Sequence, residues 1–338
     1  MDLKKIIASL SKAEQVELVR LLQYELNVPK LAEIHCGQSK DAVVHCTHCG
    51  SADIYGHGTY KGRRRYQCKC CRTTFNDFTG TAVSGIKKVA KFQEYINLVL
   101  ESVSIRKAAS TLDINIKTAF DWRHKILSAL STFNGASFDG IVECDDKQLD
   151  INEKGSKHLN RKPYKRQSDR HTKRGVSNDK VSVMVATDRK GNPTMQAAKV
   201  GRIDAASIEA SIGKYISKDN VLCSDSHKSI ISWALSKNIE HHTFVASKQH
   251  VKDKCYHVQH VNSLDNRYER WIKRFYGVAT KYIANYLHWF VCLEKLKKAS
   301  QRATDMARII LSNIKAMADY RNIEASYQNL NIIQYSKT

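Results

Sequence analysis

Apolar residues recur along this chain with two different periods, and the changes of period mark its expected elements. Residues 2–27 show a helical period, with Ser11 and Glu14 at the spacing of a capping box. The helical period returns over residues 86–130 and again near the end of the chain. Between residues 140 and 245, short apolar runs of strand length alternate with helical stretches. The pattern predicts several folded parts rather than one uniform domain.

The stretch from 140 to 245 predicts three strands, a helix, a strand, a helix and a final strand. This is the order of a ribonuclease-H-like α/β fold. The first strand is an apolar run interrupted by Glu143 and ending in Asp145 and Asp146. The later elements are expected at residues 179–192, 194–203, 204–216, 220–225, 226–237 and 239–245. In such a fold the ends of the first and fourth strands lie side by side, so we expect Asp145 to meet Asp225.

Two neighbouring carboxylates repel one another unless a cation lies between them. Magnesium or manganese prefers oxygen ligands, and two such ions activate a nucleophile and stabilise the leaving oxygen of a phosphodiester. The alternative is that Asp145 and Asp225 are ordinary strand-end or helix-capping residues, because a helix is expected directly after Asp225. If Glu143 and Asp145 share one face of the strand, Asp146 points to the other. Glu143 is then expected to support the metal ligands rather than to be one.

The charge of the chain indicates a polyanionic partner. Its 338 residues contain 55 Lys and Arg against 33 Asp and Glu, a formal net charge of +22. Nucleic acid is the favoured partner, and a ribosome- or membrane-associated protein is the alternative. The sequence shows neither a secretory signal nor an apolar stretch long enough to span a membrane. Ten cysteines without an export signal favour a reducing compartment, so we expect a cytoplasmic protein of bacterial type.

Four of the cysteines have the spacing of a zinc site. Two Cys-x-x-Cys pairs, Cys46 with Cys49 and Cys68 with Cys71, are separated by a stretch long enough for a hairpin. A domain this small has little core, so structural zinc would supply much of its folding free energy. Cys36 and Cys70 are left as spare cysteines, and His45, His48 and His57 are the alternative ligands. The basic run Arg63, Arg64 and Arg65 on the hairpin suits DNA phosphates, although a solvated face is the other interpretation.

Residues 104–127 predict a helix-turn-helix. Apolar residues mark the inner face of each helix, and a turn is expected at Asp113–Asn115. On the second helix, Lys117, Thr118, Asp121 and Arg123 are expected to face a major groove. Many helical pairs in other proteins look similar, so the prediction depends on the cysteine pairs and the positive charge beside it. The stretch 154–175, whose only acid is Asp169, is expected to be a basic insertion or a phosphate-facing loop.

Together these pieces resemble the zinc-ribbon insertion-sequence transposases of the DDE superfamily, in the ISXO-two-like branch. The resemblance runs from about Cys46 to Phe290. It is carried by the motifs "CTHCGS…YQCKCCRTTFNDFTGT", "SIRKAASTLDI…TAFDWRHKIL", "GIVECDD", "LCSDSHKSI" and "HVNSLDNRYERWIKRFYGVATKYIANYLHWF". The implied fold has N-terminal helices, a zinc ribbon, a helix-turn-helix, an RNase H-like α/β catalytic core and a helical C-terminal tail. The expected bounds are 1–33, 34–80, 85–130, 138–300 with its insertion at 154–175, and 301–338.

By this resemblance Asp145 and Asp225 are the first two catalytic acids. The superfamily places Glu at the third position with a base two helical turns later, and some members of this branch use Asn. Here Asn262 follows "HV" as in the family motif, Asp265 lies three residues on, and Asn266 has Lys273 at the expected spacing. We expect Asn262 with Asp265 beside it to complete the site. Lys273 or Arg274 would contact DNA beside the metals.

The resemblance implies a transposase of a short insertion sequence. The ribbon and the helix-turn-helix would bind terminal inverted repeats of double-stranded DNA. The core would free a 3′-hydroxyl by metal-dependent hydrolysis and join it to target DNA, and a homo-oligomer is expected on DNA. One alternative is a catalytically inactive, transposase-derived DNA-binding protein. The other is a nuclease of the same fold that acts on branched DNA or RNA.

Overall fold

A computed structural model describes residues 44–60, 62–133, 137–156, 180–245, 251–253 and 255–325, and, before residue 44, residues 7, 9–16, 18, 31 and 34. The chain divides into two compact units, residues 1–125 with 298–316 and residues 126–297 with 317–338. The expected capping box is confirmed: the N–H of Ser11 donates to the carboxylate of Glu14 at 2.8 Å, and the N–H of Glu14 donates to Ser11 Oγ at 3.3 Å. Most of the expected helix 2–27 and of the insertion 154–175 lies outside the described residues.

The first unit contains a small three-stranded antiparallel sheet in the order β1-β2-β3. Its strands are β1 (Ile54–Tyr60), β2 (Arg63–Cys68) and β3 (Thr74–Asn76). The buried residues of this sheet are Cys46, Cys68 and Phe75, with Ile54 and Tyr66 packed against them. Such a small apolar core stabilises little by itself, so the sheet depends on its cysteines.

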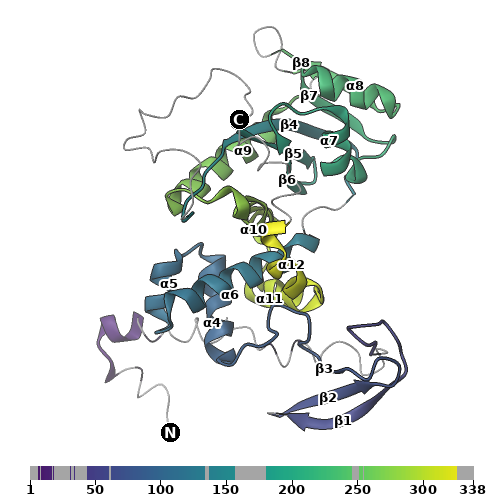
Figure 1. Ribbon diagram of the computed structural model, residues 1–338. Helices are drawn as coiled ribbons and strands as arrows, with labels where there is room; N and C mark the ends of the chain where they lie inside the picture. The colour runs from purple at the N-terminus through teal and green to yellow at the C-terminus, as the bar shows by residue number, and fades with distance from the viewer. Residues whose placement is uncertain are drawn as a thin grey trace. The chain divides into compact units, whose positions relative to one another are not determined.

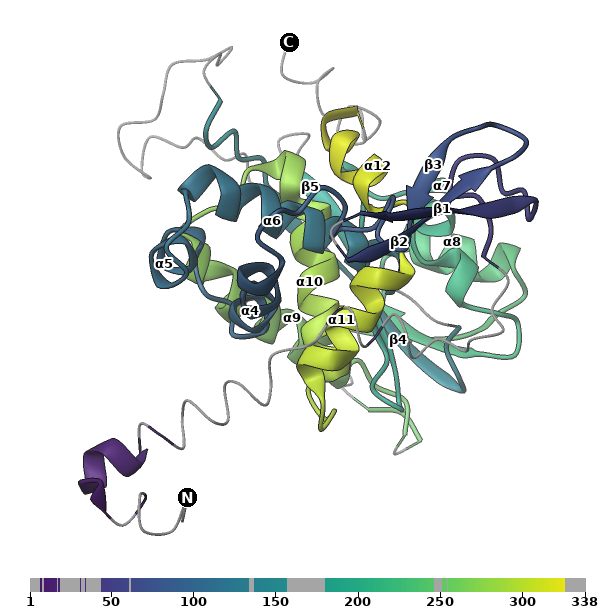
Figure 2. The same cartoon turned by 90° about the horizontal axis from the view of Figure 1, so that it is seen from below.

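Three helices follow in the same unit, and Figure 2 shows them side by side: α4 (Val89–Leu100), α5 (Ile105–Thr111) and α6 (Ile116–Ala129). Ser104 begins α5 by accepting the N–H of Lys107 on its side chain. The expected turn is confirmed, and Asp113 adopts the left-handed conformation there with φ 46°. Helix α11 (Arg302–Ser312) packs against α4. This part of the expected tail therefore belongs to the helical unit.

The second unit is built on a five-stranded sheet in the order β6-β5-β4-β7-β8. Its strands are β4 (Ile141–Asp150), β5 (Lys180–Asp188), β6 (Pro193–Val200), β7 (Val221–Asp225) and β8 (Glu240–Phe244). Strand β4 lies at the centre, antiparallel to β5 and parallel to β7. The predicted succession of strands and helices is confirmed, with α7 (Ala205–Ser211) and α8 (Lys228–Ser236) between the later strands.

The two faces of this sheet have different coverings. Val142 and Cys144 of β4 are buried with residues of α7 and α8, such as Ile208 and Trp233, in one core cluster. Because strand side chains alternate, Glu143 and Asp145 point to the opposite face. That face carries α9 (Gln259–Ile272), which contacts β4 and β5 (Figure 1). The acids of β4 are therefore presented to α9.

Shorter elements complete the second unit. Helix α10 (Ile283–Leu296) packs against β6 and against η1 (Leu130–Phe133). The remaining turns and helices are η3 (Gly213–Tyr215), η4 (Lys273–Phe275), η5 (Thr280–Tyr282) and α12 (Ala316–Arg321). Among the described helices, none has the length and apolar character needed to span a membrane.

Candidate active site

Two aspartates lie side by side at the ends of neighbouring parallel strands. Strands β4 and β7 pair in a register that sets Cys144 opposite Ser224, so the next residues, Asp145 and Asp225, are adjacent. Both point to the face of the sheet that α9 covers, because Cys144 points into the other core. Asp225 is exposed, and it accepts the N–H of His227 at 3.1 Å just before α8. The residue that caps α8 is His227, whose side chain accepts the N–H of Ser229.

The carboxyl group of Asp145 is held in an unfavourable environment for its charge. Burial, together with the negative charges of Asp225 and Asp265, raises its pKa to about 7. This shift identifies Asp265 as a third acid within electrostatic reach of Asp145. A bound cation would remove the repulsion that causes part of this shift.

Asp265 comes from the middle of α9 and is largely buried, with 14% of its side chain exposed. Burial raises its pKa to about 6; Lys147 lowers it, while Glu269 and Asp146 raise it. Lys147 Nζ lies 4.0 Å from Asp265 Oδ2 and 2.8 Å from Glu269 Oε1. The other oxygen of Asp265, Oδ1, is buried and accepts no hydrogen bond within the described residues. A metal ligand needs a free oxygen of this kind.

The other expected residues on and after α9 are exposed. Asn262 is exposed one turn before Asp265, and in the described part of the chain no hydrogen bond joins its side chain to Asp145 or Asp225. Asn266 is exposed as well. Lys273 follows the end of α9 in η4, where its charge acts on Glu269. The structure thus places Asp265 within electrostatic reach of Asp145, while the side chain of Asn262 is exposed.

Glu143 has a different role from its neighbour Asp145. It is only 1% exposed, and its carboxylate accepts the backbone N–H of His260 at 2.7 Å and that of Val261 at 3.0 Å. These are among the first N–H groups of α9, which have no partner inside the helix. A carboxylate at this end also compensates the positive end of the helix dipole. Glu143 thereby docks the start of α9 onto β4.

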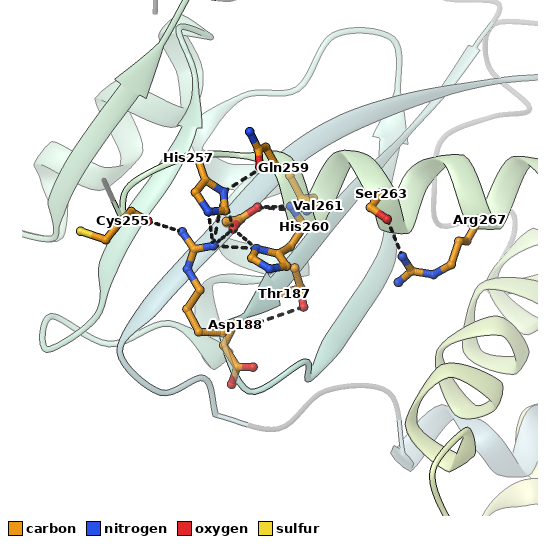
Figure 3. A network of polar contacts seen from close by, with 11 residues as sticks. Thr187, Asp188, Cys255, His257, Gln259, His260, Val261, Ser263 and Arg267 are labelled. Atoms are coloured by element: carbon orange, nitrogen blue, oxygen red, sulfur yellow. Dashed lines mark hydrogen bonds and ion pairs between the residues drawn. The ribbon is translucent and has the colours of Figure 1, made fainter. Parts of the chain in front are cut away.

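Positive and ring groups surround Glu143, and Figure 3 shows two of them, His257 and His260. Oxygen and nitrogen atoms of Glu143, His257 and His260 lie within 4.8 Å of one another, a grouping typical of metal sites. Arg189 Nη1 lies 2.5 Å from Glu143 Oε1, 2.6 Å from His260 Nδ1 and 2.9 Å from His257 Nε2. Burial and the charge of Arg189 lower the pKa of His257. The guanidinium therefore occupies the position where a cation would bind, and the cluster is a structural support.

Sequence reasoning missed the partners of this support. Arg189 follows the end of β5, far along the chain from Glu143, and nothing in its surroundings marks it as an ion-pair partner. His257 and His260 have a recognisable His-x-x-His spacing at the beginning of α9. That spacing was the available signal for their proximity. Lys147 follows Asp145 by two residues, and the strand period already places it on the same face.

The four paired cysteines come together in the small sheet. Their sulfur atoms lie within 4.8 Å of one another, with Cys46 Sγ 3.5 Å from Cys71 Sγ and Cys49 Sγ 3.6 Å from Cys68 Sγ. Hydrogen bonds from Thr73 lower the pKa of Cys71 to about 6. Four soft thiolate donors at such spacing suit a tetrahedral divalent metal.

The spare cysteine Cys70 is exposed and contacts Ser51 Oγ at 3.2 Å, outside the sulfur cluster. Cys36, the other spare cysteine, lies outside the described residues. His45, His48 and His57 do not enter the sulfur cluster.

The structure corrects one expected DNA contact. Arg123 is completely buried, and its guanidinium donates to the carbonyl of Val103 at 2.6 Å and lies over the ring of Tyr95. It points inward because α6 turns this face towards α4. Lys117 is exposed, and it forms an ion pair with the half-buried Asp121. Thr118 is half-buried beside them.

The arginines of the β1–β2 hairpin differ in exposure. Arg63 is half-buried, with its guanidinium 3.7 Å from the centre of the Phe78 ring. Arg64 is exposed, and Arg65 is half-buried. Of the three, Arg64 is therefore the most accessible to a phosphate.

Comparison with known proteins finds a family match within the second unit. Residues 137–291, slightly less than half of the chain, match the family of the ISXO2-like transposase domain. An uncharacterized protein in transposable element ISH50 of Halobacterium salinarum is 31% identical over 152 residues, which cover 43% of this chain and 50% of that protein. The chain thus spans about half the length of this relative. The resemblance to the ISXO-two-like branch is confirmed over the matched region.

Among solved structures, a pre-cleavage Mos1 transpososome is 12% identical and covers 68% of this chain and 78% of its own, with a TM-score of 0.18. That score is too low to show a common fold.

Proposed function

We propose that this chain, which carries an ISXO2-like transposase domain over residues 137–291, is a metal-dependent transposase that cuts and joins the ends of an insertion sequence. The observation that carries the proposal is that Asp145 and Asp225 lie side by side at the ends of adjacent parallel strands. Asp265 of α9 lies within electrostatic reach of Asp145. The sheet order, with β4 at the centre beside β7, supports an RNase H-like core.

The residues present fit a hard divalent cation. The donors are carboxylate oxygens, the Asp265 Oδ1 atom is buried without a hydrogen bond in the described residues, and the Asp145 carboxyl is shifted towards its protonated form. Asp145, Asp225 and Asp265 would hold magnesium or manganese. When bound, such ions lower the pKa of a water nucleophile and stabilise the leaving oxygen of a phosphodiester.

The residues around the acids have supporting roles in this proposal. Glu143 and Arg189 fix the start of α9, so that α9 presents Asp265 to the face of the sheet that carries Asp145. Lys147 balances the charge of Asp265 and Glu269 while DNA is absent. Lys273 and Arg274 are exposed beyond the end of α9, where they would bind the phosphates of the DNA strand.

The first unit would recognise the element ends. Its sulfur cluster suits structural zinc, and the exposed Arg64 and Lys117 are suited to phosphate contacts. A transposase brings two DNA ends together, so we expect a homo-oligomer on double-stranded DNA. As part of the same proposal, we place the protein in the cytoplasm of a bacterial cell.

The test is strand cleavage and joining on a labelled duplex that carries the element's own ends, in magnesium. We expect the wild type to cut and join, and Asp145→Ala and Asp225→Ala to bind the duplex without cutting it. Asp265→Ala and Asn262→Ala test which residue fills the third catalytic position. We expect Asp265→Ala to lose more cleavage activity, because Asp265 lies within electrostatic reach of Asp145. Binding that persists in EDTA, without cleavage in magnesium or manganese, would instead identify an inactive DNA-binding descendant. Cleavage without joining or end preference would identify a nuclease.

A further inference from the structure

The turn that follows α9 presents an aromatic ring to solvent. Tyr276 is 91% exposed, and within the described residues its ring makes no ring contact and its hydroxyl no hydrogen bond. The preceding residue behaves differently. Phe275 packs among the rings of Trp271, Tyr286 and Trp289, with centroid distances of 5.1, 5.1 and 5.2 Å. The base of the turn is therefore anchored in an aromatic cluster while the next ring is directed outward.

The backbone of this turn is strained. Tyr276 adopts a left-handed conformation with φ 51° and ψ 44°, which is unfavourable for a residue with a side chain. Gly277 follows with φ 92°, and an added Cβ would lie 2.9 Å from Asn152 Nδ2. Strain of this kind persists only where the surroundings impose it.

The surroundings that impose the strain come from the chain just after β4. Lys154 Nζ donates to three consecutive carbonyls, those of Phe275 at 3.3 Å, Tyr276 at 3.0 Å and Gly277 at 2.9 Å. Asn152 and Thr280 exchange two further hydrogen bonds, at 2.7 and 2.8 Å. The turn is thus held in one shape before any ligand binds, which reduces the entropy lost on binding.

The charges around the ring suit a nucleic acid. Lys273 and Arg274 are exposed on the same turn, directly before the anchored Phe275. A flat aromatic ring beside two cations matches the chemistry of a nucleotide, whose base stacks and whose phosphate carries negative charge.

The turn is also at a useful distance from the acids. Asp265 lies in α9, and Tyr276 directly follows η4, the turn that continues from α9; eleven positions separate the two residues. At 1.5 Å per residue this is about 16 Å, or about five base steps of a DNA strand.

We propose that Tyr276 is the stacking platform for an unpaired nucleobase of the DNA substrate, within about five nucleotides of the strand that the acidic site cuts. This inference rests on the proposed function, because it takes DNA as the ligand. It adds a binding site that separates or holds one base near the cleavage point. Lys273 and Arg274 hold the adjoining phosphates, and Lys154 keeps the platform rigid.

The test compares two substitutions of Tyr276 in the full-length protein. Tyr276→Asn removes the ring but tolerates the left-handed backbone, whereas Tyr276→Phe keeps the ring and loses only the hydroxyl. The probe is a duplex carrying the element's ends with 2-aminopurine placed at one position at a time around the cleavage point. We expect one or two positions to change fluorescence on binding to the wild type and to Tyr276→Phe, and not to Tyr276→Asn.

Affinity supplies the second measurement. Tyr276→Asn should weaken binding of the ends on the order of 10-fold, with an unchanged dependence on salt, since no charge is lost. Arg274→Ala should instead reduce the salt slope by about 1. Thermal unfolding of each variant, expected to match the wild type because the ring is exposed, checks that the fold is intact.

The outcomes separate this inference from the function beneath it. If the wild type and Asp225→Ala bind the ends and Tyr276→Asn binds equally well, the stacking site is wrong while the transposase proposal stands. If Tyr276→Asn changes the oligomeric state in the absence of DNA, the ring contacts a second copy of the chain and the inference is overturned. If the wild type does not bind the ends at all, both proposals fail.

Discussion

The carboxylate of Glu143 accepts the backbone N–H of Val261 at 3.0 Å, which joins the central strand of the sheet to the first turn of the helix that carries Asp265. The side chain that makes this link is only 1% exposed and is paired with Arg189. Asp145 lies two residues after Glu143 on the same face of the strand. Glu143, paired with Arg189, therefore fixes the start of the helix that carries Asp265 on the strand that carries Asp145.

Replacing Glu143 should lower the stability of the protein. In Glu143→Ala, Arg189 and two helix N–H groups lose their partner, so we expect the free energy of unfolding to fall by about 3–5 kcal/mol. Glu143→Gln keeps an amide oxygen for the N–H groups but loses the ion pair, so its loss should be smaller. Urea unfolding measures both. Equal losses for the two variants would contradict the assigned role.

The acidic site should make stability depend on pH in the metal-free protein. The pKa of Asp145 rises from its ordinary value of 3.8 to about 7 in the folded chain. Between these values the folded state binds more protons than the unfolded state, so this site's contribution to stability falls as pH rises from about 4 to about 7. Asp265, with a pKa of about 6, acts in the same direction.

Magnesium should reverse this loss, because the ion binds the ionised carboxylates. We expect magnesium to raise the midpoint of urea unfolding more at about pH 7.5 than at about pH 5.5. These two pH values lie on either side of the pKa values of Asp145 and Asp265. Asp145→Asn should show a smaller fall, because only Asp265 still titrates, and a smaller gain from magnesium. A magnesium effect that is equal at both pH values would argue against ion binding at this site.

The cysteine cluster predicts one zinc ion per chain. Cys46→Ser removes a cluster thiolate, and we expect it to lose the metal and unfold the small sheet, whose apolar core is too limited to hold alone. Cys70→Ser is the matched control, since Cys70 is exposed and outside the cluster. Metal content after dialysis and near-ultraviolet circular dichroism provide the measurements. Loss of zinc from both variants would refute the assignment of ligands.

The two basic residues of α6 should differ in what they control. Arg123→Met leaves the Val103 carbonyl without its donor inside the protein, so we expect a loss of stability of about 1–3 kcal/mol. Lys117→Ala removes an exposed charge, so we expect stability to be nearly unchanged and DNA binding to weaken with a lower salt slope. Thermal unfolding and fluorescence anisotropy separate the two effects. If Arg123→Met instead weakened DNA binding and left stability unchanged, Arg123 would have to leave the core to bind DNA.

Much of this protein was predictable from local pattern. The alternation of apolar residues over 140–245 predicted the strands and helices of the second unit in their correct order, because period and turn residues are local properties of the chain. The spacing of Cys46, Cys49, Cys68 and Cys71 predicted their cluster, because a knuckle of this length brings its own sulfurs together. The pairing of β4 with β7, and with it the meeting of Asp145 and Asp225, followed from the strand order.

Tertiary structure decided the rest, because periodicity states which residues share a face but not what arrives against that face. The helical period placed Asn262 and Asp265 on one broad side of α9, and only the docking of α9 by Glu143 turned Asp265 towards Asp145. For the same reason the helical period could not show that α4 covers the face of α6 that carries Arg123, which is buried. The capture of three carbonyls by Lys154, which holds Tyr276 in solvent, joins positions more than a hundred residues apart. Contacts over such separations depend on how elements pack, and no local pattern encodes them.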